Sequence, residues 1–181
     1  MIEKTLDITT KDGVMETFIC YPERNRPSPA VFLLMDAHGI REELKDMARR
    51  LGTVGYYVLL PNLYYRAGRD TIYGPDVLTH GSAEHGRMRA VRTKMTIPPV
   101  MDDVAAMLAF IDSQEMAKPG PVGAHGYFER ALRASRRGAL SRPRHRRRLV
   151  LWHLAGQRRR GKPASVIGQG QGRALHRLRR A

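Results

Sequence analysis

Hydrophobic and polar residues alternate over the first twenty positions of the chain, and short apolar blocks follow. Residues 3–10 and 13–22 each alternate with a period of two, and the KDG turn between them predicts a β-hairpin. The block 29–35 is continuously apolar, which is typical of a strand buried on both faces, and the mainly apolar block 56–64 predicts a second buried strand. A loop rich in proline and glycine leads into a third predicted buried strand at 121–127.

Apolar positions with helical spacing predict two longer helices, one before Gly52 or Gly55 and one after Pro98 and Pro99, and a shorter helix is expected at 83–95. The defining positions are Ile40, Leu44, Met47, Ala48 and Leu51 in the first helix, and Val104, Met107, Leu108 and Ile111 in the second. Strands that alternate with helices indicate an α/β fold, with a mostly parallel sheet flanked by helices.

Two strand ends carry the candidate chemistry. The first buried strand runs into MDAHGIRE at 35–42, and the third runs into GAHGYFER at 123–130. Binding and catalytic groups of parallel sheets gather at the carboxyl ends of the strands. We therefore expect these two segments to form one site.

The net charge of +15 on 181 residues is unevenly distributed. Residues 1–128 hold 15 Lys and Arg against 16 Asp and Glu, whereas 129–181 hold 17 Lys and Arg and a single acid, Glu129. A lone cysteine, Cys20, allows no disulfide within the chain, and no apolar run is long enough for a transmembrane helix. A cytoplasmic protein without membrane contact is the expectation.

The segment 129–181 differs in composition from the rest of the chain. Arginine outnumbers lysine sixteen to one there, and Asp, Asn, Thr, Tyr, Met, Cys and Phe are absent. Its few apolar residues follow neither a helical nor a strand repeat, and they cannot offset the entropy lost on ordering. We expect 1–128 to form the folded part and 129–181 to be a basic, disordered tail.

The stretch VFLLMDAHGIREELKDMARRLGTVGYYVLLPNLYYR, residues 31–66, resembles the dienelactone hydrolase family of α/β hydrolases. An acidic residue ends a strand, a glycine and a helix follow, and GYYVLLPNLY comes next. The later PVGAHGY resembles the strand that enters the family's nucleophile elbow. This resemblance covers about residues 1–127 and implies an incomplete α/β-hydrolase fold. It further implies cleavage of small-molecule esters or lactones by a Cys-His-Asp triad, without cofactor or metal.

The chain leaves the family pattern at the catalytic position. Gly126 and Tyr127 fit the elbow, but the cysteine nucleophile is replaced by Phe128, and a small residue is replaced by Arg130. The resemblance implies that the intact relative is an enzyme, and that this chain lacks its nucleophile and is inactive.

A frameshift explains both the missing cysteine and the tail. The tail has the composition that a GC-rich gene yields when it is read out of frame. Codons allowed for residues 137–163, started one base later, can spell ARYPDRVTAAASYYGTWLVSDAEES, which restores the acids, tyrosines and strand pattern. We therefore interpret 129–181 as out-of-frame sequence that begins near position 128.

The resemblance assigns further residues to the site. Asp36 occupies the position of an acid near the nucleophile, although a polar residue there could instead cap the next helix. The Ala37 N–H would be one oxyanion donor, with the second on Glu129. His38 and Tyr127 are candidate substrate-binding residues.

Arg92 is a weaker substrate-binding candidate. With Arg87 and Arg89 it could meet an anionic substrate, or these residues could form a solvated helix face. Whether Tyr64, Tyr65 and Tyr73 line the cleft or pack in the core stays open.

The remaining histidines, serines and the cysteine indicate neither a metal site nor another nucleophile. His38 and His125 lack metal-ligand spacing, and Ser82, Ser113 and Cys20 lack a nucleophile motif. The alternative function is nucleic-acid binding by the tail, which without a motif or fold would be non-specific.

Overall fold

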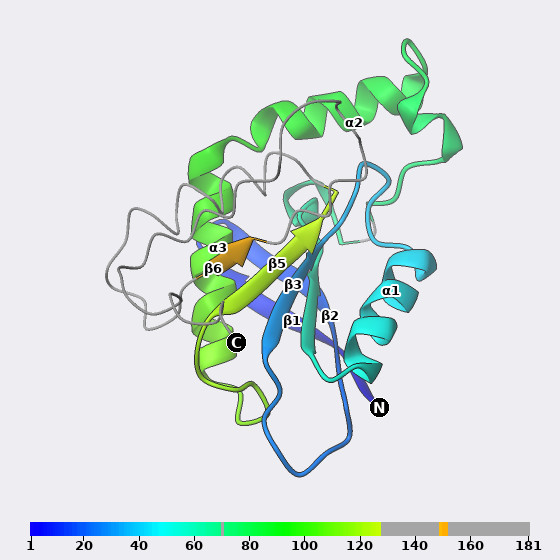
Figure 1. The fold of residues 1–181 in the computed structure, drawn as a ribbon. Coiled ribbons are helices and arrows are strands. Elements are labelled where there is room, and N and C mark those ends of the chain that lie inside the picture. The colour runs from blue at the N-terminus through cyan, green and yellow to red at the C-terminus, as the bar shows by residue number, and fades with distance from the viewer. Residues whose placement is uncertain (70, 128–148, 152–181) are drawn as a thin grey trace, which may run out of the picture.

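A six-stranded sheet forms the centre of the molecule (Figure 1). The computed structural model describes residues 1–69, 71–127 and 149–151. The order of strands across the sheet is β1-β2-β4-β3-β5-β6. The strand bounds are β1 Ile2–Thr10, β2 Gly13–Tyr21, β3 Ala30–Leu34, β4 Tyr57–Pro61, β5 Val122–Gly126 and β6 Leu149–Leu151.

The sheet combines an antiparallel hairpin with a parallel half. β1 and β2 pair antiparallel in a register that places Thr10 opposite Gly13, as the KDG turn predicted. β2 also pairs antiparallel with β4, whereas the pairs β4–β3, β3–β5 and β5–β6 are parallel. The prediction of a mostly parallel sheet is therefore confirmed, with the hairpin at one edge.

Helices cover both sides of the sheet. α1 (Glu42–Thr53) packs against β2 and β4, and α3 (Ile97–Asp112) packs against β1 and lies on the opposite side (Figure 1). α2 (Ala83–Lys94) precedes α3, and η1 (Tyr65–Ala67) and η2 (Pro75–Leu78) are short 3-10 turns between β4 and α2. All three predicted helices are therefore present.

Three details of the helices differ from the prediction. Gly52 does not stop α1 but lies inside it, where an added Cβ would come within 2.9 Å of the Met1 sulfur; the left-handed turn follows at Gly55, with φ +111°. Pro98 and Pro99 do not precede α3 but occupy its first turn, where a missing N–H costs no helical hydrogen bond. Met47, assigned to the buried face of α1, is 38% exposed.

β6 lies in the tail, where the hydrophobic pattern predicts no strand. Leu149–Leu151 pair in parallel with β5, with Val122 opposite Leu149. Three residues are too few for an alternating pattern, so this strand carries no signal in the sequence. The rest of the predicted tail lies outside the described residues.

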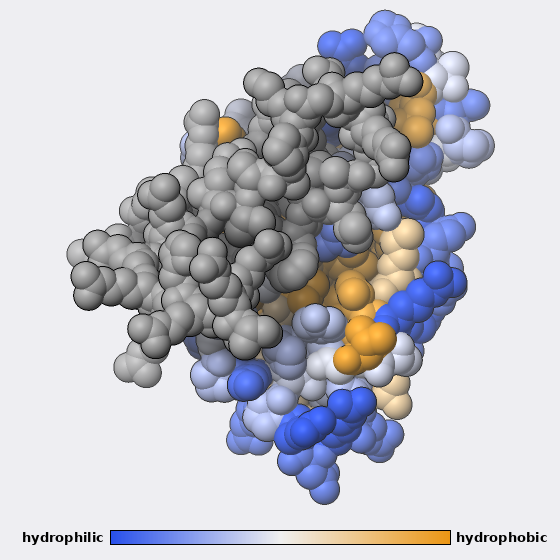
Figure 2. Space-filling model, viewed as in Figure 1, coloured by the Kyte–Doolittle hydropathy of each residue, from blue (hydrophilic) through white to orange (hydrophobic). Residues whose placement is uncertain are grey.

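The described surface is mainly hydrophilic on the face in Figure 2. Apolar atoms gather there in a small area near the middle of the view. Exposed large apolar side chains of the described residues include Val54, Ile72 and Leu78. None of the described helices has the length and apolar character needed to cross a membrane.

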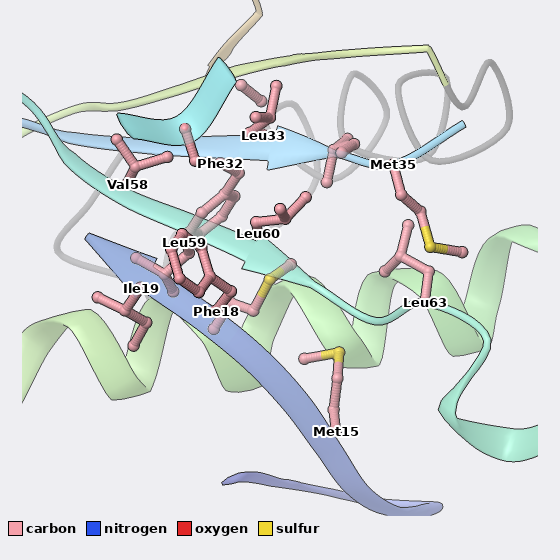
Figure 3. Close-up of a cluster of buried hydrophobic side chains, with 14 of the residues drawn as sticks. Met15, Phe18, Ile19, Phe32, Leu33, Met35, Val58, Leu59, Leu60 and Leu63 are labelled. Atoms are coloured by element: carbon pink, nitrogen blue, oxygen red, sulfur yellow. The ribbon is translucent and has the colours of Figure 1, made fainter. Parts of the chain in front are cut away.

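The hydrophobic core fills the space between the sheet and the helices. Side chains from β2, β3 and β4 converge in Figure 3, and Phe32, Leu59 and Leu60 among them are fully buried. Burying one such side chain stabilises the folded state by about 1.5–3 kcal/mol. The central strands are therefore held firmly, and the ends of β3 and β5 are fixed in space.

Candidate active site

The ends of β3 and β5 lie side by side, as the sequence predicts. Leu34 is opposite Gly126 in the parallel register, and the Tyr127 N–H donates to the Leu34 carbonyl oxygen at 3.3 Å. Asp36 is the second residue of the loop that follows β3. The two predicted segments therefore meet at one edge of the sheet.

Gly126 permits this close approach of the strands. A Cβ at position 126 would collide with the Leu34 carbonyl oxygen and come within 2.7 Å of the Leu34 Cβ. A side chain at this position would therefore separate the two strands. Glycine is required by contact with β3, which the sequence alone did not show.

The carboxylate of Asp36 is fully engaged by its own loop. Arg41 donates two hydrogen bonds to it, from Nη1 to Oδ1 at 2.7 Å and from Nη2 to Oδ2 at 2.8 Å. The His38 N–H donates to Oδ1 at 3.0 Å. Burial alone raises the pKa of Asp36, but these hydrogen bonds and the charge of Arg41 outweigh it and lower the pKa below its ordinary value.

Ala37 is held through its carbonyl oxygen, which accepts a hydrogen bond from the Tyr64 hydroxyl at 3.2 Å. Its N–H donates to no acceptor among the described residues. A free backbone N–H after a strand is suited to bind a developing negative charge.

His38 is fixed by its backbone. Its carbonyl oxygen accepts from the Tyr73 N–H at 2.9 Å. Its Nδ1 is buried, lies 3.6 Å from Asp36 Oδ1, and has no hydrogen-bond partner in the described structure. Gly39 follows with φ +93°, and an added Cβ would collide with the Thr71 carbonyl oxygen. Residues that follow β4, Thr71 and Tyr73, therefore contact the loop after β3 at Gly39 and His38 and hold it in place.

Tyr127 reaches outward from the end of β5. Its side chain is 55% exposed, and its hydroxyl contacts the Met47 sulfur at 3.9 Å. The His125 ring meets the Tyr127 ring edge-on, with 5.9 Å between centroids. Tyr127 can therefore contact a molecule at the strand ends. Phe128, the next residue, lies outside the described residues.

Arg92 lies on α2 near the buried Tyr64. Its positive charge opposes the rise that burial causes in the pKa of the Tyr64 phenol. Arg87, by contrast, is exposed and pairs with Glu84 on the same helix. The charge of Arg87 also opposes the rise that burial causes in the pKa of Tyr73.

The three tyrosines do not share one role. Tyr64 is fully buried, and its ring meets that of Tyr73 edge-on at 5.5 Å between centroids, so both belong to the packing under the loop. Tyr65 instead bonds to Thr10 at 2.7 Å and to Asp103 at 2.8 Å, away from the strand ends.

The other candidate nucleophiles have structural surroundings. Cys20 is buried in β2, and burial raises the pKa of its thiol to about 12. Ser82 caps α2 by accepting from the His85 N–H at 3.0 Å. Ser113 donates to the Phe110 carbonyl oxygen at 2.7 Å, which ends α3.

Two polar clusters were missed from the sequence. Arg41 was not recognised as the partner of Asp36, although a cation five residues after an acid in a short loop can reach back to it. The second cluster joins Asp103, fully buried on α3, to Arg66 at 2.9 Å, and Arg66 to Asp12 at 2.7 Å. The sequence signal for the second cluster was an acidic residue, Asp103, among the apolar residues of one helix face.

A hollow of about 140 Å³ lies outside the candidate site. Its lining includes Phe18, Ile40, Thr71 and Ile72, but neither Asp36 nor Tyr127. It borders the loop at Ile40 alone and is distinct from the strand ends.

Comparison with known proteins gives the family. The model of the dienelactone hydrolase family matches residues 15–128. A protein of Methylorubrum extorquens, provisionally named a carboxymethylenebutenolidase, is 29% identical over 127 residues, which make up 70% of this chain and 41% of that protein.

Solved structures show the same fold. A provisionally assigned dienelactone hydrolase of Klebsiella pneumoniae superposes with a TM-score of 0.63 at 19% identity, covering 81% of this chain and 56% of that one. A dienelactone hydrolase-like promiscuous phosphotriesterase from metagenomic libraries has a TM-score of 0.56 at 19% identity, covering 83% and 58%.

The chain therefore spans about four-tenths to six-tenths of the length of these relatives. The match covers most of β2, the strands β3, β4 and β5, and the loop with Asp36. This chain belongs to the dienelactone hydrolase family.

Proposed function

We propose that the intact form of this protein hydrolyses small-molecule ester or lactone bonds. The observation that carries the proposal is the contact between Gly126 and Leu34, which brings the end of β5 beside the loop with Asp36 and Ala37. A strand that ends against a neighbour and then turns sharply is the setting of a nucleophile elbow. Family membership supports the same chemistry.

The proposed nucleophile is a cysteine thiolate at the position that Phe128 occupies. The thiolate attacks the carbonyl carbon, and a histidine gives a proton to the departing alcohol. Water then cleaves the thioester, which releases the acid and regenerates the thiol. The histidine of the triad and the acid that orients it are not assigned to residues of this chain.

The loop after β3 has the supporting roles in this proposal. The Ala37 N–H donates to the developing oxyanion, with the N–H of residue 129 as the second donor. Asp36 is anionic at neutral pH, as an ordinary carboxyl is, and its lowered pKa favours this form further; it acts near the thiol as an acceptor and not as an acid. His38, Tyr127 and Arg92 border the substrate.

The frameshift interpretation makes this chain an inactive form. Phe128 carries no nucleophilic atom, and 129–181 have the composition of out-of-frame sequence. Resequencing the locus tests this part: an uninterrupted reading frame that encodes 129–181 would contradict it.

The enzymatic proposal is tested by hydrolysis of p-nitrophenyl acetate. The 181-residue chain should give no turnover above the uncatalysed rate, whereas the frame-repaired protein with Phe128→Cys should turn the ester over. The matched control is the repaired protein that retains Phe128. A repaired, folded protein with cysteine that cleaves neither esters nor lactones would refute the proposal.

The tail supports a second, weaker candidate, because residues 129–181 carry all of the excess positive charge. We propose non-specific binding of nucleic acid, which should weaken steeply with salt. Retention on DNA at physiological salt that is lost when 129–181 are removed would favour evolved binding instead. The cytoplasmic location stays a prediction.

A further inference from the structure

We propose that Tyr64 is a positioning residue that orients the backbone of Ala37 for oxyanion binding. This inference rests on the proposed hydrolase function, because the oxyanion exists only in that reaction. Tyr64 lies three residues after β4 and does not belong to either of the strand ends that form the site. Its connection to the site is the hydrogen bond from its hydroxyl to the Ala37 carbonyl oxygen.

The peptide group between Ala37 and His38 is held at both ends. Its carbonyl oxygen accepts from the Tyr64 hydroxyl at 3.2 Å, and its N–H donates to Asp36 Oδ1 at 3.0 Å. Asp36 cannot easily turn away, because both of its oxygens accept from Arg41. The plane of this peptide is therefore fixed by two side chains that approach from opposite ends.

The Ala37 N–H belongs to the preceding peptide group, whose direction depends on the rotation at the Ala37 Cα. Both neighbours of Ala37 are anchored, because Arg41 holds the Asp36 carboxylate and His38 is held through its N–H and its carbonyl oxygen; rotation at the Ala37 Cα is therefore restricted from both sides. An N–H without an acceptor among the described residues is thus held in one direction before any substrate arrives. Preorganised donors of this kind stabilise a transition state most, because they need no reorientation.

Tyr64 itself is rigid and stays protonated. Its ring is fully buried and packs edge-on against Tyr73, and its N–H donates to the Asn62 side chain at 3.0 Å. Burial raises the pKa of its phenol above the ordinary value, which the charge of Arg92 only partly opposes. The hydroxyl therefore remains a hydrogen-bond donor throughout the neutral range.

Tyr64→Phe tests the inference, because it removes the hydroxyl and keeps the ring. The matched control is Tyr65→Phe, which removes the neighbouring hydroxyl that bonds to Thr10 and Asp103. Hydrogen–deuterium exchange of the full 181-residue chain is measured in the segment 36–41 and in the hairpin turn 10–13. The His38 amide, which bonds to Asp36, reports on the loop.

Tyr64→Phe should accelerate exchange in 36–41 by on the order of fivefold, as loss of one neutral hydrogen bond allows, and leave 10–13 unchanged. Tyr65→Phe should do the reverse. Unchanged exchange in 36–41 with Tyr64→Phe, or equal acceleration in both segments, would overturn the inference.

The second readout is kinetic and uses the frame-repaired protein with Phe128→Cys. Tyr64→Phe should lower kcat by on the order of tenfold with KM within about twofold, because a displaced donor weakens binding of the transition state more than that of the ester. Tyr65→Phe should leave kcat unchanged. An unchanged kcat with Tyr64→Phe would refute the positioning role. If the parent protein cleaves no ester, the proposed function fails, and exchange alone decides whether Tyr64 orders the loop.

Discussion

Gly126→Ala should destabilise the protein strongly although it adds only one methyl group. That methyl would collide with the Leu34 carbonyl oxygen and come within 2.7 Å of the Leu34 Cβ, so β5 must move away from β3. Overpacking of this kind costs about 1–3 kcal/mol. Losing the hydrogen bond from the Tyr127 N–H to Leu34 adds about 1 kcal/mol. We expect a total loss of about 2–4 kcal/mol in the free energy of unfolding.

Urea unfolding followed by far-ultraviolet circular dichroism measures this loss. The matched control is Gly86→Ala on α2, where an added Cβ meets no atom within 4 Å. That control should stabilise the protein by about 0.5–1 kcal/mol, because alanine favours a helix more than glycine does. If Gly126→Ala and the parent chain unfold at the same urea concentration, the close approach of β3 and β5 at Gly126 is contradicted.

Two further predictions concern buried polar groups away from the site. Cys20 has a pKa raised by burial from 9.0 to about 12, so its thiol should resist Ellman's reagent until the chain is unfolded. As pH rises, the thiol of the unfolded chain loses its proton before the buried thiol does. The contribution of Cys20 to the free energy of unfolding is therefore complete below pH 9 and should fall as pH rises toward 12. Urea unfolding across that range measures this fall. Asp103→Ala should lower the free energy of unfolding by about 3 kcal/mol, because it leaves the guanidinium of Arg66 without its buried partner. Asp102→Ala, which breaks only an exposed pair with Lys11 at 3.7 Å, should cost less than about 1 kcal/mol; equal losses would contradict this assignment.

The helices and strands were predictable because the side chains that each one buries recur in the sequence with the period of that element. The alternating hairpin, the apolar blocks of β3 and β4, and the helical repeat of α3 all occur where expected. That the end of β3, just before Asp36, lies beside the end of β5 was also predictable, because parallel strands end at the same edge of a sheet.

Contacts that depend on side-chain direction were not predictable. The hydrogen bond from Arg41 to Asp36 and the one from Tyr64 to Ala37 connect residues that no periodic pattern in the sequence relates. The exposure of Met47 depends on how α1 sits against β2 and β4, since a helical repeat gives only a broad face. β6 is too short for any pattern to mark it.

The central claim is that a thiol nucleophile belongs at the end of β5, where this chain has Phe128. The most direct measurement is the intact mass of the frame-repaired protein with Phe128→Cys, quenched in acid during turnover of p-nitrophenyl acetate. We expect the added mass of one acetyl group, located by peptide mapping at position 128 and absent from the repaired protein that retains Phe128. A folded, repaired protein that carries no acetyl group at 128, or carries it at Cys20 instead, would contradict the account.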